Sequence, residues 1–128
     1  EETEPQGNER ILFIDDEESL VTLARAFFES RGYRITATVN SLDAFRLFQK
    51  NPDGFDLVIT DMTMPEITGA ELVRAFLKIR ADIPIILCTG YSDSISVAEV
   101  RKLKIREFVL KPVALNDLGR LVRRVLDS

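Results

Sequence analysis

The residues of this sequence that could do chemistry together are three aspartates, a threonine and a lysine. Each stands at the end of a short run of apolar residues; they are Asp15, Asp16, Asp61, Thr89 and Lys111. Clustered carboxylates repel one another and need a cation, and ligand sets made only of oxygen favour Mg²⁺. A lysine can hold an anionic oxygen as a point charge, and a hydroxyl can donate to another. The set fits a phosphoryl group carried by one carboxylate, with the metal and the lysine neutralising charge during in-line transfer.

These residues can meet only if the apolar runs before them are strands of one sheet. Strand-like and helix-like segments alternate along the sequence. Strands are predicted over residues 11–14, 33–39, 55–60, 83–89 and 107–110. Helices are predicted over residues 18–31, from Asn40 or Ser41 to Pro52, and over 69–80, 93–104 and 114–127. This alternation predicts an α/β fold, a doubly wound (βα)5 arrangement with a five-stranded parallel sheet and helices on both faces.

The strand predicted over residues 33–39 differs from the other four. A parallel strand that is buried on both faces is a continuous apolar run, whereas this segment contains several polar residues. It is therefore expected at an edge of the sheet. Open α/β sheets bind their ligands at the carboxyl ends of the strands, so the three aspartates, the threonine and the lysine are predicted to converge there.

Length and charge limit the classes of protein to which the chain can belong. Its 128 residues suit one domain, predicted over residues 10–128. The polar segment over residues 1–9, with its proline and glycine, is predicted to be a flexible linker or tail. The net charge of -4 argues against direct binding of nucleic acid.

Cysteine, histidine and apolar content exclude further classes. The single cysteine, Cys88, cannot form an internal disulfide and gives no sign of secretion. No apolar run approaches the roughly 18 residues of a membrane span, so a cytoplasmic protein without membrane contact is expected. The sequence has no histidine, which excludes a histidine metal site, a Ser-His-Asp triad and a phosphohistidine within this chain.

The chemically interesting residues lie in motifs that resemble those of the receiver domain of bacterial two-component response regulators. The matching motifs are the pair Asp15-Asp16, the run Asp61-Met62-Thr63-Met64-Pro65 followed by Gly69, and the pairs Thr89-Gly90 and Lys111-Pro112. Each motif alone is weak evidence, but all of them occur in order at predicted strand ends. The resemblance covers roughly residues 9 to 127 and implies the flavodoxin-like receiver fold.

The resemblance implies that Asp61 is the phosphoacceptor. The phosphodonor would be a phosphohistidine of a histidine kinase or of a histidine phosphotransfer domain. Asp16 and Asp61 would ligate Mg²⁺ or Mn²⁺ directly, together with the backbone carbonyl of Thr63, and Asp15 would act mostly through metal-bound water.

The resemblance also implies a switch. Thr89 would bind the phosphoryl group and move toward it, Lys111 would pair with it, and Phe108 would be the switch aromatic that swings inward. These movements would rearrange the face formed by the fourth helix, fifth strand and fifth helix, and a phosphorylation-dependent homodimer is one expected outcome. Pro112 matches the family's cis-proline, which orients the lysine.

Two further positions are expected to tune the lifetime of the phosphorylated state. Thr63 lies two residues after Asp61, and Tyr91 lies two residues after Thr89. Both are expected to flank the path of the hydrolysing water. Our hypothesis is that the bulky Tyr91 side chain shields the acyl phosphate and slows its loss.

Purely structural interpretations exist for the same residues. The carboxylates could cap turns or the start of a helix, Thr89 could simply end its strand, and Lys111 could be a surface lysine. Phe108 could be a static core aromatic, because it lacks the hydroxyl that a tyrosine would use when pointing outward.

Other functions of similar architecture fit the sequence less well. A phosphatase or phosphotransferase with an aspartyl nucleophile typically has a second aspartate two residues later, where this chain has Thr63. A flavin-binding module needs a phosphate-binding loop after the first strand, and the acidic residues 15–18 would repel a phosphate unless a metal intervened. A degenerate receiver would lack part of the acceptor set.

The parent protein is open at this point. The acidic lead-in and the motifs favour, by analogy, the carboxyl-terminal receiver of a hybrid sensor histidine kinase, with a DNA-binding response regulator as the alternative. The domain itself would catalyse only its own phosphotransfer and slow dephosphorylation, whereas the parent could be a kinase.

Overall fold

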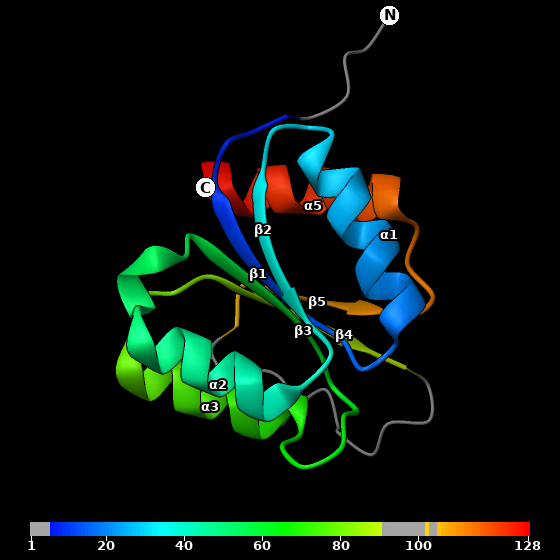
Figure 1. Ribbon diagram of the computed structural model, residues 1–128. Helices are drawn as coiled ribbons and strands as arrows, with labels where there is room; N and C mark the ends of the chain where they lie inside the picture. Colours follow the sequence, from blue (N-terminus) through cyan, green and yellow to red (C-terminus); the bar gives the residue numbers. More distant parts are fainter. Residues whose placement is uncertain (1–5, 91–101, 103–104) are drawn as a thin grey trace, which may run out of the picture.

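The structure, a computed structural model, describes residues 6–90, 102 and 105–128 and contains one parallel sheet (Figure 1). Its strands are β1 (Arg10–Ile14), β2 (Arg34–Thr38), β3 (Leu57–Asp61), β4 (Ile85–Thr89) and β5 (Glu107–Leu110). They pair in the order β2-β1-β3-β4-β5, and every pairing is parallel. The predicted parallel sheet is confirmed.

Helices cover both faces of the sheet, as the alternation predicts. They are α1 (Glu18–Glu29), α2 (Ser41–Lys50), α3 (Gly69–Ile79) and α5 (Leu115–Asp127), and a short 3-10 helix, η1 (Pro52–Gly54), precedes β3. In Figure 1, α1 and α5 lie on one side of the sheet and α2 and α3 on the other. The helix predicted over residues 93–104 lies, apart from Lys102, outside the described residues.

The two edge strands of the sheet are β2 and β5. β2 is the polar segment that the sequence places at an edge, and this prediction is confirmed. By its sequence, β5 is expected among the continuous apolar runs. In the structure, however, β5 forms the opposite edge of the sheet, and the burial of its residues alternates. An edge strand has one neighbouring strand instead of two, so Phe108 and Leu110 remain partly exposed, whereas all residues of β3 and β4 are buried.

Most element ends differ from the predicted ends by one or two residues. The helix predicted to reach residue 31 ends at Glu29, and Gly32 follows with φ +96°, a conformation that glycine adopts without strain. The third strand begins at Leu57 rather than at residue 55 and includes Asp61. Asp61 therefore belongs to the ladder of the sheet, opposite Cys88 of β4.

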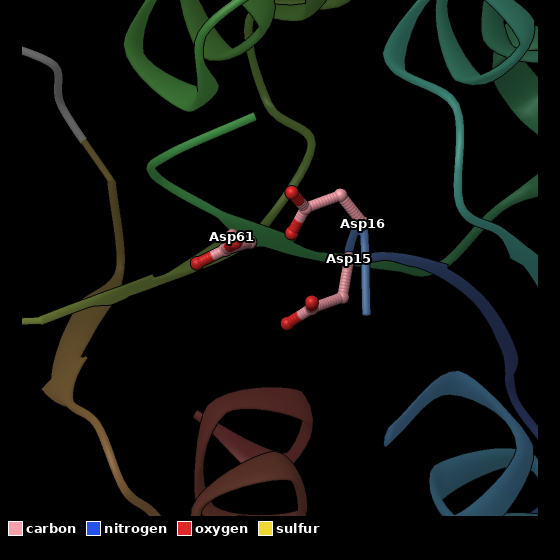
Figure 2. A group of neighbouring side chains, drawn as sticks. All are labelled: Asp15, Asp16 and Asp61. Atoms are coloured by element: carbon pink, nitrogen blue, oxygen red, sulfur yellow. The ribbon is translucent and has the colours of Figure 1, made fainter. Parts of the chain in front are cut away.

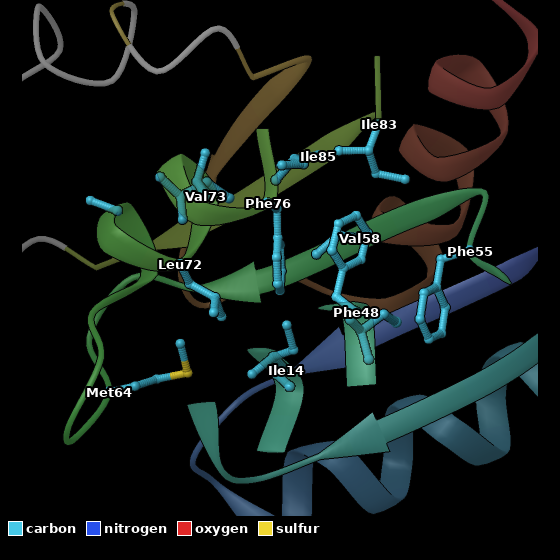
Figure 3. Close-up of a cluster of buried hydrophobic side chains, with 14 of the residues drawn as sticks. Ile14, Phe48, Phe55, Val58, Met64, Leu72, Val73, Phe76, Ile83 and Ile85 are labelled. Carbon is cyan, nitrogen blue, oxygen red and sulfur yellow. The ribbon is translucent and has the colours of Figure 1, made fainter. Parts of the chain in front are cut away.

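Two hydrophobic clusters hold the sheet between the helices. The cluster between the sheet and helices α2 and α3 (Figure 3) is centred on aromatic rings, with the Phe48 and Phe76 centroids 4.4 Å apart. The cluster on the other face packs the sheet against α1 and α5 and includes Phe28, Val122 and the buried Cys88. Closely packed cores hold the elements around them in place, so these clusters fix the strands and, with them, the residues at the strand ends.

Residues 6–9, in the segment predicted to be a flexible tail, contact the domain. The Gly7 N–H donates to the Arg31 carbonyl over 3.1 Å, and Arg123 Nη2 of α5 lies 2.6 Å from Glu9 Oε2. The partner in α5 is 114 residues away in sequence, which is why local composition did not indicate these contacts. No helix within the described part of the chain is long and apolar enough to cross a membrane.

Candidate functional site

The residues that the sequence singles out lie at the carboxyl ends of four strands. Asp15 follows β1, Asp61 and Thr89 are the last residues of β3 and β4, and Lys111 follows β5. Backbone hydrogen bonds continue the ladder past these ends, since the Lys111 N–H donates to the Thr89 carbonyl over 2.7 Å. The site is thus built on the sheet itself rather than on long loops.

Three carboxylates form a cluster at this end of the sheet (Figure 2). The side chains of Asp15 and Asp16 leave the end of β1, and that of Asp61 leaves the end of β3. Each offers one oxygen, and these oxygens all lie within 4.8 Å of one another. We call these three residues the acidic cluster; Asp15 and Asp61 are buried and Asp16 is exposed. An oxygen-only set with one open side suits Mg²⁺, which keeps several waters and takes few carboxylates.

Lys111 supplies a positive charge to the acidic cluster. Its Nζ lies 2.8 Å from Asp15 Oδ2 and 3.1 Å from Asp61 Oδ1. Burial disfavours the charged ammonium, but the hydrogen bonds and charges of these two carboxylates outweigh burial and raise the pKa of Lys111. The lysine therefore stays protonated and holds one oxygen of each buried aspartate.

One lysine does not neutralise three carboxylates. Burial, and next the charge of Asp15, raise the pKa of Asp61 from 3.8 to about 6, although Lys111 acts in the opposite direction. A raised pKa means that the ionised carboxylate is under-stabilised where it lies. The acidic cluster thus lacks enough positive charge to balance its carboxylates. The residues present fit a divalent metal, which would supply that charge.

The loop between β3 and α3 lies against Asp61. The Gly69 N–H donates to the Met62 carbonyl over 2.8 Å, and a Cβ on Gly69 would come within 2.2 Å of the Asp61 backbone oxygen. Only glycine allows this approach, so α3 begins directly beside the end of β3. Thr63 lies in this loop with an exposed side chain, two residues after Asp61.

A family profile decides which class of protein this site belongs to. The profile of the response regulator receiver domain matches residues 11–123. This chain is a response regulator receiver domain. Its function is phosphorylation-dependent signal transduction in a two-component system, and an enzyme that turns over external substrates is not favoured.

Curated relatives of this receiver domain are longer response regulators. The two-component response regulator ARR10 of Arabidopsis thaliana is 28% identical over 117 residues, which are 91% of this chain and 21% of ARR10. The response regulator SaeR of Staphylococcus aureus is 27% identical over 116 residues, 91% of this chain and 50% of SaeR. The receiver domain thus spans half of one relative and about a fifth of the other.

Solved receiver structures share the fold. A response regulator receiver domain protein from Clostridium thermocellum superposes with a TM-score of 0.86 at 29% identity, covering 93% of this chain and 94% of that one. The chemotaxis protein CheY4 of Vibrio cholerae superposes with a TM-score of 0.82 at 24% identity, covering 93% and 99% of the two chains. The latter likeness concerns the fold alone.

Three of the remaining predicted residues of the receiver lie in β4 and β5 or just after β5. Thr89 is buried at the end of β4. Phe108 pairs with Leu87 across the β4–β5 ladder and is 37% exposed. The Lys111–Pro112 peptide bond is cis. Tyr91 lies outside the described residues.

Proposed function

We propose that Asp61 is the phosphoacceptor of this receiver domain and that the acidic cluster holds Mg²⁺ or Mn²⁺ during the transfer. The observation that carries the proposal is the position of the Asp61 carboxylate. It is buried, lies 3.1 Å from the Lys111 ammonium and is within 4.8 Å of oxygens of two further carboxylates. The purely structural interpretation of Asp61 as a turn cap does not account for all three properties, because a turn cap needs neither the lysine nor the other aspartates.

The transfer needs a nucleophile and a way to stabilise charge. A carboxylate oxygen of Asp61 forms a bond to phosphorus while the bond from phosphorus to the donor imidazole nitrogen breaks, and that nitrogen keeps the electron pair. Lys111 stabilises a phosphoryl oxygen by exchanging its contact with Asp61 for that oxygen. When bound, the divalent cation supplies charge neutralisation for the equatorial phosphoryl oxygens.

The other members of the site orient these groups. Asp15 is held at two points, by Lys111 Nζ and by the Glu17 N–H, which donates to Asp15 Oδ1 over 2.9 Å. With both of its oxygens engaged, Asp15 would act mostly through metal-bound water, whereas Asp16, Asp61 and the Thr63 carbonyl would be direct ligands of the metal. The Thr89 hydroxyl donates to a phosphoryl oxygen, and Phe108, partly exposed on the edge strand, is the side chain that can swing inward.

The phosphodonor in this proposal is a histidine kinase or a histidine phosphotransfer domain, because the chain has no histidine of its own. The parent that we favour is a hybrid sensor histidine kinase. The coding sequence on either side of this domain tests the parent: a kinase core upstream supports it, and a DNA-binding domain downstream contradicts it.

The phosphoacceptor is tested with a small-molecule donor. The domain is incubated with acetyl phosphate and Mg²⁺, and its intact mass is measured. We expect the wild type to gain one phosphoryl group and Asp61→Asn to gain none. Asp56→Asn is a matched control, because Asp56 precedes the same strand at its opposite end, and it should be labelled like the wild type.

Removal of the metal by a chelator should abolish labelling of the wild type. Labelling that persists in Asp61→Asn would refute Asp61 as the acceptor. Labelling that persists without a divalent cation would refute the role of the acidic cluster.

A further inference from the structure

The loop between β3 and α3 contains a strained turn. The Ile67 N–H donates to the Pro65 carbonyl over 2.9 Å, and Glu66 between them has φ 70°. A turn closed over three residues with positive φ at its centre is the rare form of the γ-turn. Glu66 is the one non-glycine with positive φ in the described part of the chain. Such a conformation persists only where the surroundings hold it.

The side chain that holds this turn comes from α2. The Ser41 hydroxyl donates to the Pro65 carbonyl over 3.0 Å and accepts from the Ile67 N–H over 3.2 Å. One hydroxyl thus closes both ends of the γ-turn. Ser41 is only 3% exposed, so water cannot easily replace these two hydrogen bonds.

Ser41 is free for this task because its neighbour caps the helix. The Asn40 side chain is the N-cap of α2 and accepts from the Asp43 N–H over 3.0 Å. The first residue of the helix can therefore direct its hydroxyl away from its own backbone and toward a loop that is 24 residues away in sequence.

The clamped turn lies in the loop that carries the Thr63 carbonyl. The start of this loop is fixed by the Met62 N–H, which donates to the Cys88 carbonyl over 2.8 Å, and its end by the hydrogen bond from Gly69 to Met62. Between these points, the Ser41 hydroxyl joins the start of α2 to the backbone of Pro65 and Ile67. The Ser41 hydroxyl is therefore one of the contacts that fix the path of the loop that carries the Thr63 carbonyl.

We propose that Ser41 is a positioning residue for the metal site: its hydroxyl holds the β3–α3 loop so that the Thr63 carbonyl points toward the acidic cluster. This inference rests on the proposed function, which makes that carbonyl a metal ligand. Ser41 touches neither the metal nor the phosphoryl group. It acts only through the loop, so its loss weakens binding without removing a ligand.

The test compares Ser41→Ala with Asn40→Ala in the full chain. Both changes affect the start of α2, but only Ser41→Ala removes the hydroxyl from the loop. Amide hydrogen exchange by NMR is measured without metal. Mg²⁺ affinity is then measured on the unphosphorylated protein from amide chemical shifts during a titration, and stability by urea unfolding.

We expect Ser41→Ala to accelerate exchange of the Ile67 amide and to weaken Mg²⁺ binding about fivefold, less than the roughly 10- to 100-fold loss on removing a group that orients a ligand directly. Asn40→Ala should lower stability while leaving Mg²⁺ affinity and Ile67 exchange unchanged.

Unchanged Mg²⁺ affinity in Ser41→Ala would overturn the proposal, even if Ile67 exchange accelerates. Equal weakening in both variants would also overturn it, because the effect would then follow helix stability. A wild type whose amides near the acidic cluster do not respond to Mg²⁺ would instead refute the proposed function, so the two failures are distinguishable.

Discussion

The two ends of the sheet differ in how many cations accompany their carboxylates. At the carboxyl ends, the acidic cluster of three carboxylates shares one lysine. At the amino ends, carboxylates contact arginines. Arg123 Nη2 lies 2.6 Å from Glu9 Oε2 and 2.8 Å from Asp127 Oδ1, and Arg10 Nη2 lies 3.1 Å from Asp56 Oδ1.

The pKa directions follow this balance. The hydrogen bond from Arg123 holds the pKa of Glu9 below its usual value, and that from Arg10 does the same for Asp56. Burial raises the pKa of Asp61 to about 6. A paired carboxylate stabilises the fold, whereas an under-compensated one leaves a site for a cation. Charged pairs at the amino ends thus hold the domain together, whereas the charge at the carboxyl ends is available for the role that we propose for Asp61.

The largest expected effect comes from removing the lysine ammonium that contacts the acidic cluster. Lys111→Met leaves buried carboxylates without their partner and should lower the free energy of unfolding by about 3 kcal/mol. Mg²⁺ should restore part of this loss, because it replaces the missing positive charge. Urea unfolding with and without Mg²⁺ measures both effects.

Arg123→Met is the control for this prediction at the opposite end of the sheet. Its partners Glu9 and Asp127 are 23% and 62% exposed, whereas the partners of Lys111 are 3% and 6% exposed. The loss of Arg123 should therefore cost less and should not respond to Mg²⁺. A Mg²⁺-independent loss in Lys111→Met would contradict the distinction between the two ends.

Carboxylate-to-amide changes at the two ends of the sheet should have smaller effects on stability. The effect at one end should be opposite in sign to the effect at the other. Asp61→Asn removes a repelling charge and should stabilise the metal-free domain by about 1–2 kcal/mol. Glu9→Gln removes the charge from a hydrogen-bonded, partly exposed pair and should destabilise the domain by less than about 1 kcal/mol. Thermal or urea unfolding in the presence of a chelator measures both.

Saturating Mg²⁺ should remove the advantage of Asp61→Asn, because the wild type gains the free energy of binding. If both variants change stability in the same direction without metal, the two ends do not differ in charge balance.

The smallest expected effect is the pH dependence of the Glu9 pair. Because the pKa of Glu9 is lowered from 4.5, the folded domain binds fewer protons than the unfolded chain between the two pKa values. Stability from this pair is complete above the unfolded pKa and is lost as the pH falls through the folded one.

The stability difference between the wild type and Glu9→Gln should therefore shrink as the pH falls below about 4.5, and it should stay below about 1 kcal/mol, because the pair is partly exposed. Unfolding by urea at a series of pH values measures it. If the stability difference grew as the pH fell, the pH dependence would have the opposite sign and a lowered pKa of Glu9 would be excluded.

The strand ends were predictable because their signals are local. Asp15, Asp61 and Thr89 each end a run of apolar residues that can only be buried in a sheet, and the parallel order follows from the alternation of strands and helices. The edge position of β2 was also predictable from its polar residues. The position of β5 was not, because four residues are too short to distinguish a central strand from an edge strand.

The sequence by itself determined which side chains reach the carboxyl end of the sheet and that they include too many carboxylates for one lysine. Only the tertiary structure decided which of them touch: Lys111 with Asp15 and Asp61, Ser41 with the β3–α3 loop, and Arg123 with Glu9. The physical reason is distance along the chain. Hydrophobic periodicity acts over a few residues, whereas these contacts join residues 24 to 114 positions apart and depend on how the helices pack against the sheet.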